Sequence, residues 1–527
     1  MATATQSKLS PILVDGRWQA SSGSQSFQSS NPATGEPLAE QFPVSSWDDC
    51  ERILDAAASA ASQLRALPPE RIAAFLEDYA ARIDAAAAEL SQMAATETAL
   101  PLEPRLSKVE LPRTSGQLRQ AAAAARSGSW AMPTIDTKLN IRSCFEALGP
   151  VCVFGPNNFP FAFNSVAGGD FAAAIAAGNP VIAKANSSHP ATTRMLAELA
   201  HSAVEATGLP RATVQLIYRL SHDDGAKLVS DPRIGATGYT GSRHAGLTLK
   251  AAADKAGKPI YLELSSVNPL VILPGAVKER GNELVDEFAG SALMGAGQFC
   301  TNPGLVLMLA SPETDKFIAG VKEKYSTAAA GTLLSTGVAR SLTKAIETLS
   351  SAGAKLEVGG QAVEGRCSVN NTLLTVSAKK FIADSETFQT EAFGNATLVV
   401  VADSLTEMVE VIAALEGNLT GCIYSDKNGS DDTAYDTIAP ELTRRVGRLL
   451  NDKMPTGVAV SPAMNHGGPY PATGHPGFTA VGIPASMIRF GKLTCFDNVR
   501  QHRLPTLLRD APPTADTWRY IDGQWKK

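Results

Sequence analysis

The sequence lacks the patterns that mark disulfide-rich and metal-binding proteins. Its seven cysteines are scattered along the chain and form no Cys-x-x-Cys pair, which argues against a disulfide framework or a structural zinc site and favours a reducing compartment. Its seven histidines include no His-x-x-x-His pair, so no helix is predicted to offer two metal ligands on one face. We therefore expect no bound metal.

Blocks of positive charge and long apolar runs are missing too. The formal net charge is −5 and lysines and arginines do not cluster, so neither nucleic acid nor a membrane is an expected partner. No apolar run approaches the length needed to cross a bilayer. The stretch from Met1 to Ser10 is polar and has no apolar core of a secretory signal. Together these absences predict a cytoplasmic location.

The residues that are present have the ordinary composition of a globular protein, 44% hydrophobic and 19% charged over 527 residues, enough for two or three domains. Between residues 150 and 265, short apolar strands alternate with helices, which predicts a parallel, doubly wound α/β sheet. Ligands of such sheets bind at the carboxyl ends of the strands. Asn158, Lys184, Gly241 and Glu263 fall at or just beyond such ends.

One cysteine lies in an unusual setting, the stretch Gly295-Ala-Gly-Gln-Phe-Cys300-Thr-Asn-Pro-Gly304. A thiol is a good nucleophile only as thiolate, which requires a reachable, polar pocket. The glycines would let a substrate and a flat cofactor ring approach the sulfur. Taken alone, such a cysteine is more often a buried structural residue, so the rest of the chain has to decide between the two interpretations. A second α/β run follows it.

Two further residues are candidates for catalysis. Glu263 interrupts the apolar strand Tyr261-Leu-Glu-Leu264, and a buried carboxyl group is costly unless it is paired or used as an acid or base. A structural ion pair would explain it equally well. Asn158, in Pro156-Asn-Asn-Phe-Pro160, could donate its amide to a developing oxyanion, or it could simply belong to a turn before proline.

Three elements are candidates for binding a cofactor. Lys184 ends a strand and could meet a hydroxyl or phosphate, although such a lysine is more often only solvated. Thr240-Gly241-Ser242 lies where a strand meets a helix, which suits a phosphate at the helix N-terminus. Glu391 precedes Ala-Phe-Gly394 and could accept hydrogen bonds from ribose hydroxyls. The Gly-x-Gly-x-x-Gly fingerprint is absent, so these residues alone indicate a dinucleotide only weakly.

Taken in order, six motifs resemble the aldehyde dehydrogenase superfamily over roughly residues 10 to 505. They are Asn158-Phe-Pro160, Lys184 at a strand end, Thr240-Gly-Ser242, Glu263-Leu-Ser-Ser-Val-Asn-Pro269, Gly297-Gln-Phe-Cys300 and Glu391-Ala-Phe-Gly394. The resemblance implies a Rossmann-type cofactor domain (residues 1–136 and 151–265), an α/β catalytic domain (266–487) and a small β oligomerisation arm (137–150 and 488–510). It also implies a homodimer or homotetramer.

The resemblance assigns a role to each motif. Cys300 is similar to the nucleophile that attacks the aldehyde carbon, forming a thiohemiacetal and then a thioester. Asn158 and the Cys300 N–H resemble the oxyanion hole, and Glu263 resembles the base that activates water for hydrolysis. The residues expected around the cofactor are Lys184, Asn186, Ser187, Arg219, Thr240, Gly241, Ser242, Glu391 and Phe393, and those expected in the substrate pocket are Phe159, Phe163, Phe299 and Thr301.

The choice of cofactor follows from Ser187. NAD-preferring relatives usually carry a glutamate three residues after the strand-ending lysine, where it holds both ribose hydroxyls. Ser187 stands at that place, and a hydroxyl, unlike a carboxylate, would not repel a 2′-phosphate. Lys184 and Asn186 could help to bind one, and Arg219 is a further cation. We expect NADP, with NAD as the alternative.

Longer matches resemble the α-ketoglutarate semialdehyde dehydrogenase branch, among them His466-Gly-Gly-Pro-Tyr-Pro-Ala-Thr473. The chain departs from that branch at Gly474-His-Pro-Gly477 and at Asn157, and an acidic substrate would need a cation, for which Arg489 and His475 are candidates. We expect oxidation of a semialdehyde. The alternatives are a long-chain or general aliphatic aldehyde dehydrogenase, a coenzyme A-acylating relative, which generally lacks the base, and a non-catalytic binding or structural member.

Overall fold

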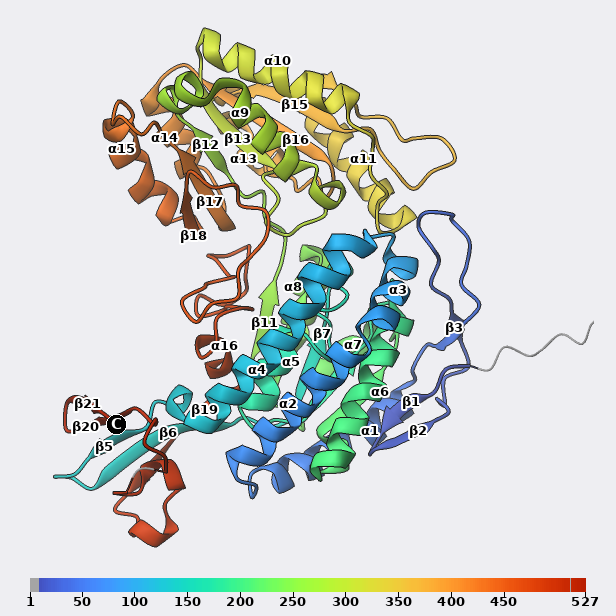
Figure 1. Cartoon of the computed structure of the whole chain (residues 1–527), viewed down its shortest axis with the longest axis vertical. Coiled ribbons are helices and arrows are strands. Elements are labelled where there is room, and N and C mark those ends of the chain that lie inside the picture. The colour runs from blue at the N-terminus through green and yellow to red at the C-terminus, as the bar shows by residue number, and fades with distance from the viewer. Residues whose placement is uncertain (1–8, 512) are drawn as a thin grey trace, which may run out of the picture.

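A computed structural model, which describes residues 9–511 and 513–527, shows two lobes and an arm that projects from one of them (Figure 1). Each lobe holds a seven-stranded sheet and the arm holds a five-stranded sheet. Residues 1–8, part of the stretch in which we expect no secretory signal, lie outside the described residues. No helix in the described residues is long and apolar enough to span a bilayer.

The sheet of the first lobe has the strand order β11-β10-β7-β8-β9-β1-β2. Strands β7 to β11 run parallel, and β1 is antiparallel to both of its neighbours. The order reverses between β7 and β10, so this is the point of a doubly wound sheet where a ligand crevice forms. The strands are β1 (Ile12–Val14), β2 (Arg17–Gln19), β7 (Val151–Phe154), β8 (Val181–Lys184), β9 (Val214–Ile217), β10 (Ala236–Thr240) and β11 (Ile260–Glu263).

Helices cover both faces of this sheet, as the predicted doubly wound fold requires (Figure 1). Its strands are buried along nearly their whole length, as expected for a parallel sheet covered on two sides. The helices are α1 (Trp47–Leu64), α2 (Pro69–Ala85), α3 (Ala87–Thr98), α4 (Leu111–Ser127), α5 (Gly169–Ala176), α6 (Pro190–Thr207), α7 (His222–Ser230) and α8 (Arg243–Lys255), with a π-helical turn at Leu102–Glu110.

The second lobe repeats the α/β pattern. Its strand order is β14-β15-β16-β13-β12-β17-β18, parallel except for β14. The strands are β12 (Leu270–Ile272), β13 (Leu305–Leu309), β14 (Lys355–Val358), β15 (Thr372–Ser377), β16 (Ala396–Ala402), β17 (Asn418–Tyr424) and β18 (Val446–Asn451). The helices are α9 (Pro274–Ala292), α10 (Pro312–Thr327), α11 (Thr336–Ser351), α12 (Ala378–Ala383), α13 (Ser385–Phe388), α14 (Leu405–Ala413) and α15 (Asp432–Thr443).

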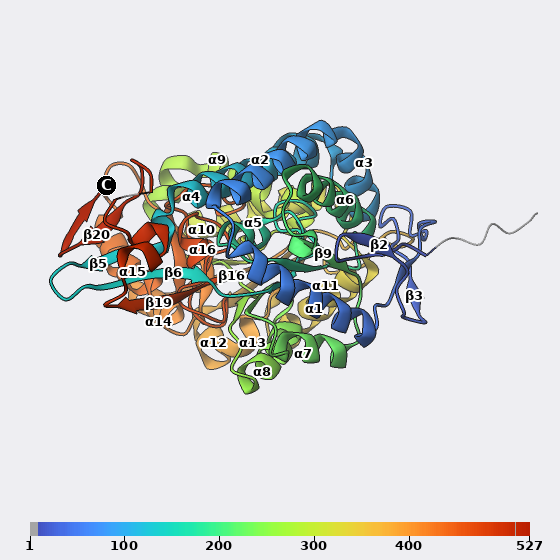
Figure 2. The same cartoon turned by 90° about the horizontal axis from the view of Figure 1, so that it is seen from below.

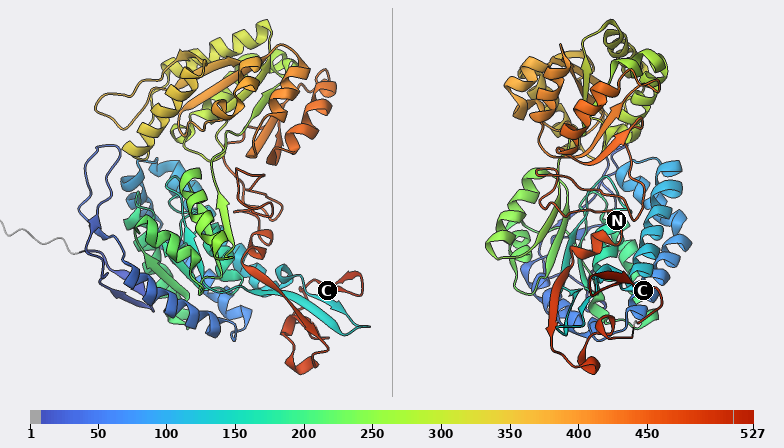
Figure 3. Two further views of the ribbon diagram at one scale, coloured as in Figure 1. Left: turned by 180° about the vertical axis from the view of Figure 1, so that it is seen from behind. Right: turned by 90° about the vertical axis from the view of Figure 1, so that its left-hand side faces the viewer.

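The arm brings together two segments that lie far apart in the chain, coloured cyan and red in Figure 2. Its strand order is β19-β6-β5-β20-β21, and β6 pairs antiparallel with β19 along its whole length. The C-terminal hairpin β20–β21 extends the sheet through β5, so the C-terminus lies beside the arm (Figure 3). The bounds are β5 (Thr134–Asp136), β6 (Ile141–Ala147), β19 (Gly491–Asp497), β20 (Arg519–Ile521) and β21 (Gln524–Lys526), with α16 (Ala485–Ile488) before β19 and the pair β3 (Ser26–Phe27) and β4 (Phe42–Pro43) on the first lobe.

Candidate active site

The ends of the parallel strands bring four predicted residues to one edge of the first sheet. Thr240 ends β10 opposite Glu263, which ends β11, and Lys184 ends β8 opposite Phe154 of β7. Asn158 follows in the loop after β7, beside the reversal of strand order. This edge is where the sequence placed a ligand site, and the second lobe supplies the cysteine that faces it.

The loop that carries Cys300 is shaped by backbone constraints. Gly295, Ala296 and Gly297 have φ values of 57°, 57° and 69°, in the left-handed region that favours glycine. A Cβ on Gly297 would lie 2.1 Å from the carbonyl oxygen of Gly394. Only glycine fits there, and through this contact the cysteine loop rests directly on the loop of the Glu391-Ala-Phe-Gly394 motif.

Gln298 fixes the same loop from the other side. Its side-chain oxygen accepts a hydrogen bond from the Leu334 N–H at 2.8 Å, and its Nε2 donates to the carbonyl oxygens of Gly295 and Thr332. The side chain is buried with all these partners satisfied. The glutamine of the Gly-Gln-x-Cys motif therefore holds the cysteine loop in place and does not itself face the sulfur.

Three side chains far apart in sequence meet at the centre of the site. His466 Nε2 lies 2.9 Å from Glu263 Oε1 and 3.5 Å from Cys300 Sγ. Glu263 and His466 are each 1% exposed, and Glu263 Oε2 has no hydrogen-bond partner in the described part of the chain. A carboxylate oxygen that is buried and unpartnered beside a thiol is placed to receive a proton.

His466 was not among the predicted site residues. Sequence reasoning noted it only as the start of the His466–Thr473 likeness to one branch, because a single histidine without a second ligand or base at fixed spacing carries no signal of its own. The loop that presents it is held by a hydrogen bond from the His466 N–H to Thr479 Oγ1 at 3.0 Å. A histidine inside a segment already matched to a family was the available clue.

The surroundings of Cys300 disfavour its thiolate. Burial, followed by the charge of Glu263, raises the pKa of the Cys300 thiol well above its usual range, and the charge of Arg113 acts in the opposite direction. The resting sulfur is therefore a thiol. Activation requires a proton acceptor at the sulfur, and His466 and Glu263 are the groups in contact.

Asn158 reaches the cysteine loop from the first lobe. Its Nδ2 donates a hydrogen bond at 3.0 Å to the carbonyl oxygen of Gln298, the residue two positions before Cys300. The Cys300 backbone N–H has no hydrogen-bond partner in the described ranges. The two donors predicted for an oxyanion hole are thus brought to the same place, one free and one held by a backbone carbonyl.

A cavity of about 710 Å³ lies next to the cysteine loop, which contributes Gly295 and Phe299 to its lining but not Cys300 itself. Phe159 and Phe299 line it, with ring centroids 5.5 Å apart and nearly perpendicular planes. Phe163 packs against Phe159 and, at 5.5 Å, against the ring of His466. These three predicted pocket residues and the partly buried Cys300 belong to one hydrophobic cluster. Such an apolar channel suits an aldehyde with a hydrocarbon chain.

Thr301 does not line this cavity. It is fully buried, and its hydroxyl accepts a hydrogen bond from the Gly457 N–H at 3.1 Å. Gly457 belongs to the loop that closes one side of the cavity. Thr301 therefore supports the wall from behind and has no access to a substrate.

Cations gather at the predicted ribose end. Burial, and then the charge of Arg219, lowers the pKa of Lys184 to about 8, so the two cations lie close enough to repel each other. Arg219 is exposed and Ser187 is partly buried. Lys184 is partly buried and its pKa is lowered by a neighbouring positive charge. An anionic partner such as a phosphate would relieve the repulsion between Lys184 and Arg219.

The remaining cofactor candidates, Asn186, Gly241 and Ser242, also have structural roles in their own loops. Asn186 donates to the Gly155 carbonyl oxygen at 3.0 Å and accepts from the Ser188 N–H, so its side chain shapes the loop. Ser242 accepts from the Ala245 N–H and caps the N-terminus of α8. A Cβ on Gly241 would lie 2.7 Å from the Tyr239 hydroxyl, which explains the glycine at this turn.

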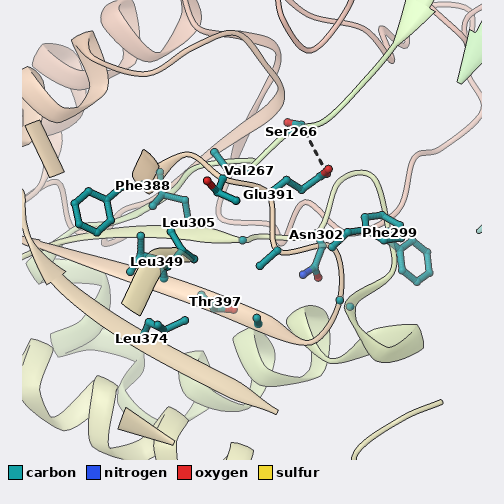
Figure 4. A pocket seen from close by; sticks show the side chains of 18 residues that line it. Ser266, Val267, Phe299, Asn302, Leu305, Leu349, Leu374, Phe388, Glu391 and Thr397 are labelled. Carbon is teal, nitrogen blue, oxygen red and sulfur yellow. Dashed lines mark hydrogen bonds between the residues drawn. The ribbon is translucent and has the colours of Figure 1, made fainter. Parts of the chain in front are cut away.

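Glu391 faces the strand connection that follows Glu263. Its Oε1 accepts a hydrogen bond from the Ser266 N–H at 3.2 Å (Figure 4). Burial raises the pKa of Glu391, against the hydrogen bond from Ser266. Phe393, two residues on, is partly buried and packs against the core of the first lobe. The Glu391 carboxylate therefore lies beside the chain segment that connects the two lobes, where a ligand between them could reach it.

The two cations first considered for an acidic substrate lie elsewhere. Arg489 is buried and paired with Asp170 at 2.7 Å. His475 packs edge-on against Tyr261 at 5.3 Å and accepts a hydrogen bond from the Gly477 N–H. The segment that departs from the branch pattern therefore covers β11 and stays out of the cavity lining.

The three side chains at the centre of the site, Glu263, Cys300 and His466, are also of types that bind metal ions. One ligand atom each from Glu263, Cys300 and His466 lies within 4.8 Å of the others, and zinc takes nitrogen, sulfur and oxygen ligands. That no metal is bound therefore stays a prediction. The same three atoms serve acid–base and nucleophilic chemistry without one.

This architecture is that of a dinucleotide-binding α/β enzyme with a cysteine at its centre. The comparison with known families gives the narrower identity: residues 18–467 match the aldehyde dehydrogenase family. The chain belongs to that family and is an oxidoreductase that acts on aldehydes. The fold predicted from the resemblance is confirmed.

Curated relatives and solved structures agree with this assignment. The chain is 39% identical over 498 residues to alpha-ketoglutaric semialdehyde dehydrogenase 2 of Azospirillum brasilense, covering 92% of this chain and 94% of the relative. It is 35% identical over 509 residues to alpha-ketoglutaric semialdehyde dehydrogenase of Acinetobacter baylyi, covering 94% and 95%. A mutant 1-pyrroline-5-carboxylate dehydrogenase of Thermus thermophilus superposes with a TM-score of 0.81 at 21% identity, covering 93% and 92%. A 3,6-anhydro-L-galactose dehydrogenase in complex with NAP gives 0.80 at 21% identity, covering 93% and 99%.

Proposed function

We propose that this protein oxidises a semialdehyde that carries a carboxylate, such as α-ketoglutarate semialdehyde, to the corresponding acid with NADP as the preferred cofactor. The observation that supports this most is the contact of Cys300, His466 and Glu263 beside an apolar cavity. The names of the curated relatives supply the class of substrate. The balanced reaction is aldehyde, NADP⁺ and water giving carboxylic acid, NADPH and one proton.

The first half of the reaction forms a bond to sulfur. Glu263 Oε2, which has no other partner in the described part of the chain, takes the thiol proton while His466 Nε2 donates to Glu263 Oε1. Cys300 Sγ attacks the aldehyde carbon to give a thiohemiacetal anion. The Cys300 N–H and the Asn158 amide stabilise the oxygen anion, the latter after leaving the Gln298 carbonyl. NADP, when bound, supplies the acceptor for the hydride that leaves this carbon, and a thioester on Cys300 results.

The second half of the reaction releases the acid. After the proton taken from the thiol has been released to solvent, Glu263 Oε2 takes a proton from a water molecule, which attacks the thioester carbon. The Cys300 sulfur leaves as thiolate and takes that proton back from Glu263. Because Glu263 provides this base, hydrolysis is favoured over transfer of the acyl group to coenzyme A. A non-catalytic role has no support, since each step has a residue suited to it.

Residues around Lys184 are proposed to hold the cofactor. Lys184, Ser187 and Arg219 would surround the 2′-phosphate of the adenosine ribose, and Glu391 would accept hydrogen bonds from the nicotinamide ribose. The lowered pKa of Lys184, about 8 through burial and the charge of Arg219, supports an anion here. A solved relative in complex with NAP and one with NAD⁺ and octanal show that both cofactors occur on this fold.

The decisive experiment follows reduced nicotinamide by absorbance with NADP and NAD against a panel of aldehydes, with and without coenzyme A. We expect the highest kcat/KM with a carboxylate-bearing semialdehyde and NADP, and no dependence on coenzyme A. Turnover confined to long-chain aldehydes would contradict the proposed substrate class. A lower KM for NAD than for NADP would contradict the proposed cofactor.

Assembly, location and domain limits complete the proposal. Exposed Leu139 and Leu493 on the arm, and its open edge strand β19, support a homodimer or homotetramer formed through the arm. All seven cysteines are free, which supports a reducing, cytoplasmic location. The division into cofactor domain (1–136 and 151–265), catalytic domain (266–487) and arm (137–150 and 488–510) is proposed on the same basis.

A further inference from the structure

The cavity next to the cysteine loop contains a charge that the chemistry at sulfur does not use. Its lining is mostly apolar or small, with three charged residues, Arg105, Glu110 and Arg113. Two cations and one anion leave a net charge of +1 on the cavity wall. Which of the two arginines carries this uncompensated charge follows from their contacts.

Arg105 and Glu110 neutralise each other. Arg105 Nη1 lies 2.5 Å from Glu110 Oε2, and the other carboxylate oxygen of Glu110 accepts hydrogen bonds from the N–H groups of Phe161 and Ala162 at 2.8 and 2.9 Å. Arg105 also donates to the Asn158 carbonyl oxygen at 3.2 Å. Both side chains therefore hold the loop after β7 and balance each other's charge, although Arg105 Nε itself has no hydrogen-bond partner in the described part of the chain.

Arg113, in the first turn of α4, has no such partner. Its Nε and Nη2 are buried without a hydrogen bond in the described part of the chain, and its Cζ lies 5.8 Å and 5.2 Å from the ring centroids of Phe159 and Phe163. A buried guanidinium without an anion is costly, and burial accordingly lowers the pKa of Arg113. A site that tolerates this cost is built for an anion that arrives from outside.

Space for that anion exists next to the guanidinium. One turn further along α4, Gly116 lines the cavity, and a Cβ placed on it would meet nothing within 4 Å. The aromatic rings of Phe159 and Phe299 stand on the side of the cysteine. A short hydrocarbon chain could pass these rings with its aldehyde toward Cys300 and its other end toward Arg113.

We propose that Arg113 binds the carboxylate at the far end of the substrate and thereby selects acidic semialdehydes over neutral aldehydes. This inference rests on the proposed function, since it names the residue that recognises the substrate. A guanidinium presents two parallel N–H donors to a carboxylate. Since an apolar wall alone accepts any aliphatic chain, Arg113 provides the discrimination that the rest of the cavity lacks.

The test compares two aldehydes of equal carbon number, α-ketoglutarate semialdehyde and pentanal, in steady-state kinetics. We expect Arg113→Met to lower kcat/KM for the acidic substrate about 10- to 100-fold, mostly through KM, and to change that for pentanal less than about threefold. Arg113→Lys should restore part of the loss. Arg119→Met, on the exposed side of α4 where Arg119 pairs with Asp84, is the matched control and should behave as the wild type.

A second readout needs no turnover. Glutarate should protect Cys300 from alkylation by iodoacetamide in the wild type and in Arg119→Met, and fail to do so in Arg113→Met. An equal loss for both aldehydes would show that Arg113 acts on the thiol and would overturn the proposal, as would unchanged kinetics or retained protection. A wild-type enzyme that oxidises neither aldehyde would instead refute the proposed function, while glutarate protection still tests Arg113.

Discussion

Cys300 lies in an environment that works against its own ionisation, because its desolvation and the carboxylate of Glu263 both raise the pKa of the thiol. Such a thiol stays protonated until a proton acceptor is in place. The contacts of His466 with both the sulfur and Glu263 make the pair of acid and imidazole that acceptor. In the proposed mechanism, formation of the thiolate and the later hydrolysis of the thioester both depend on Glu263 and His466.

The two halves of the reaction can be separated at Glu263. In Glu263→Gln, His466 remains to take the thiol proton, whereas the base for water is gone. We expect one burst of NADPH, stoichiometric with enzyme, and a steady-state rate lowered by about 10²- to 10⁴-fold. Stopped-flow absorbance measures both phases, and Cys300→Ala, which should give no burst, is the control. Full steady-state hydrolysis in the variant would remove Glu263 from the role of base.

His466 is expected to move protons as well as to position Glu263. The amide of His466→Gln can still donate to Glu263 but, unlike an imidazole, cannot hold a proton beside the thiol, so we expect kcat and the alkylation rate of Cys300 at neutral pH to fall about 100-fold. The measurement is iodoacetamide alkylation as a function of pH. His475→Gln, changed in the same C-terminal segment but outside the cavity, should leave the profile as in the wild type. An unaltered profile in His466→Gln would reduce His466 to a purely structural residue.

At the scale of single elements, the sequence predicted helix starts and strand ends best, because neighbouring residues alone determine them. Ser46-Trp-Asp-Asp49 predicted a helix start, and Ser46 caps α1 in a reciprocal capping box. Strand ends placed Asn158, Lys184 and Glu263 at one edge. The loop from Gly457 to His466 was beyond reach, because its contacts with Thr301, Cys300 and Glu263 are long-range and leave no periodic trace in the sequence.

Another buried acid, Glu97 at the end of α3, caps the neighbouring helix α6. It accepts hydrogen bonds from the N–H groups of Ala191 and Thr192, the Thr192 hydroxyl and the Ser29 hydroxyl. Burial raises the pKa of Glu97 from 4.5 to about 7 despite these bonds, which lower it. Sequence reasoning had no basis for singling out this acid within a helix.

The raised pKa of Glu97 predicts how stability depends on pH. The folded state binds the proton more tightly than the unfolded state, so the contribution of Glu97 is full below pH 4.5 and is lost as the pH rises through about 7. The loss is on the order of 3 kcal/mol. Melting temperatures between pH 5 and 8 should fall less steeply in Glu97→Gln than in the wild type. Glu89→Gln, exposed on the same helix, should follow the wild type, and parallel curves for Glu97→Gln would contradict the linkage.

At the scale of the whole molecule, the arm exposes a strand edge and an apolar side chain that no other described part of the chain covers. β19 is an edge strand, and Leu493 on it is 64% exposed. Exposed apolar edges favour association, so Leu493→Asp should lower the mass measured by light scattering after gel filtration. Leu356→Asp, the same change on edge strand β14 of the other lobe, where Leu356 is 40% exposed, is the control. Equal masses for both variants and the wild type would place the interface elsewhere.

The two-lobed arrangement itself was predictable only through family resemblance. Alternation of strands and helices indicated α/β sheets, but it could not say that the second sheet would hold Cys300 against the strand ends of the first. The C-terminal hairpin β20–β21, which extends the arm through β5, also went unpredicted, since its three-residue strands are too short for a periodic signal.

The contact between Gly297 and the Gly394 carbonyl has a consequence for altering this enzyme. Because the backbone that presents the sulfur rests on the backbone that presents Glu391 with no room for a single methyl group, the two cannot be adjusted separately. Redesign of the cofactor side through the Glu391 loop would therefore shift the nucleophile as well. Changes made at Ser187, which belongs to the other lobe, would leave the contact between these two loops undisturbed.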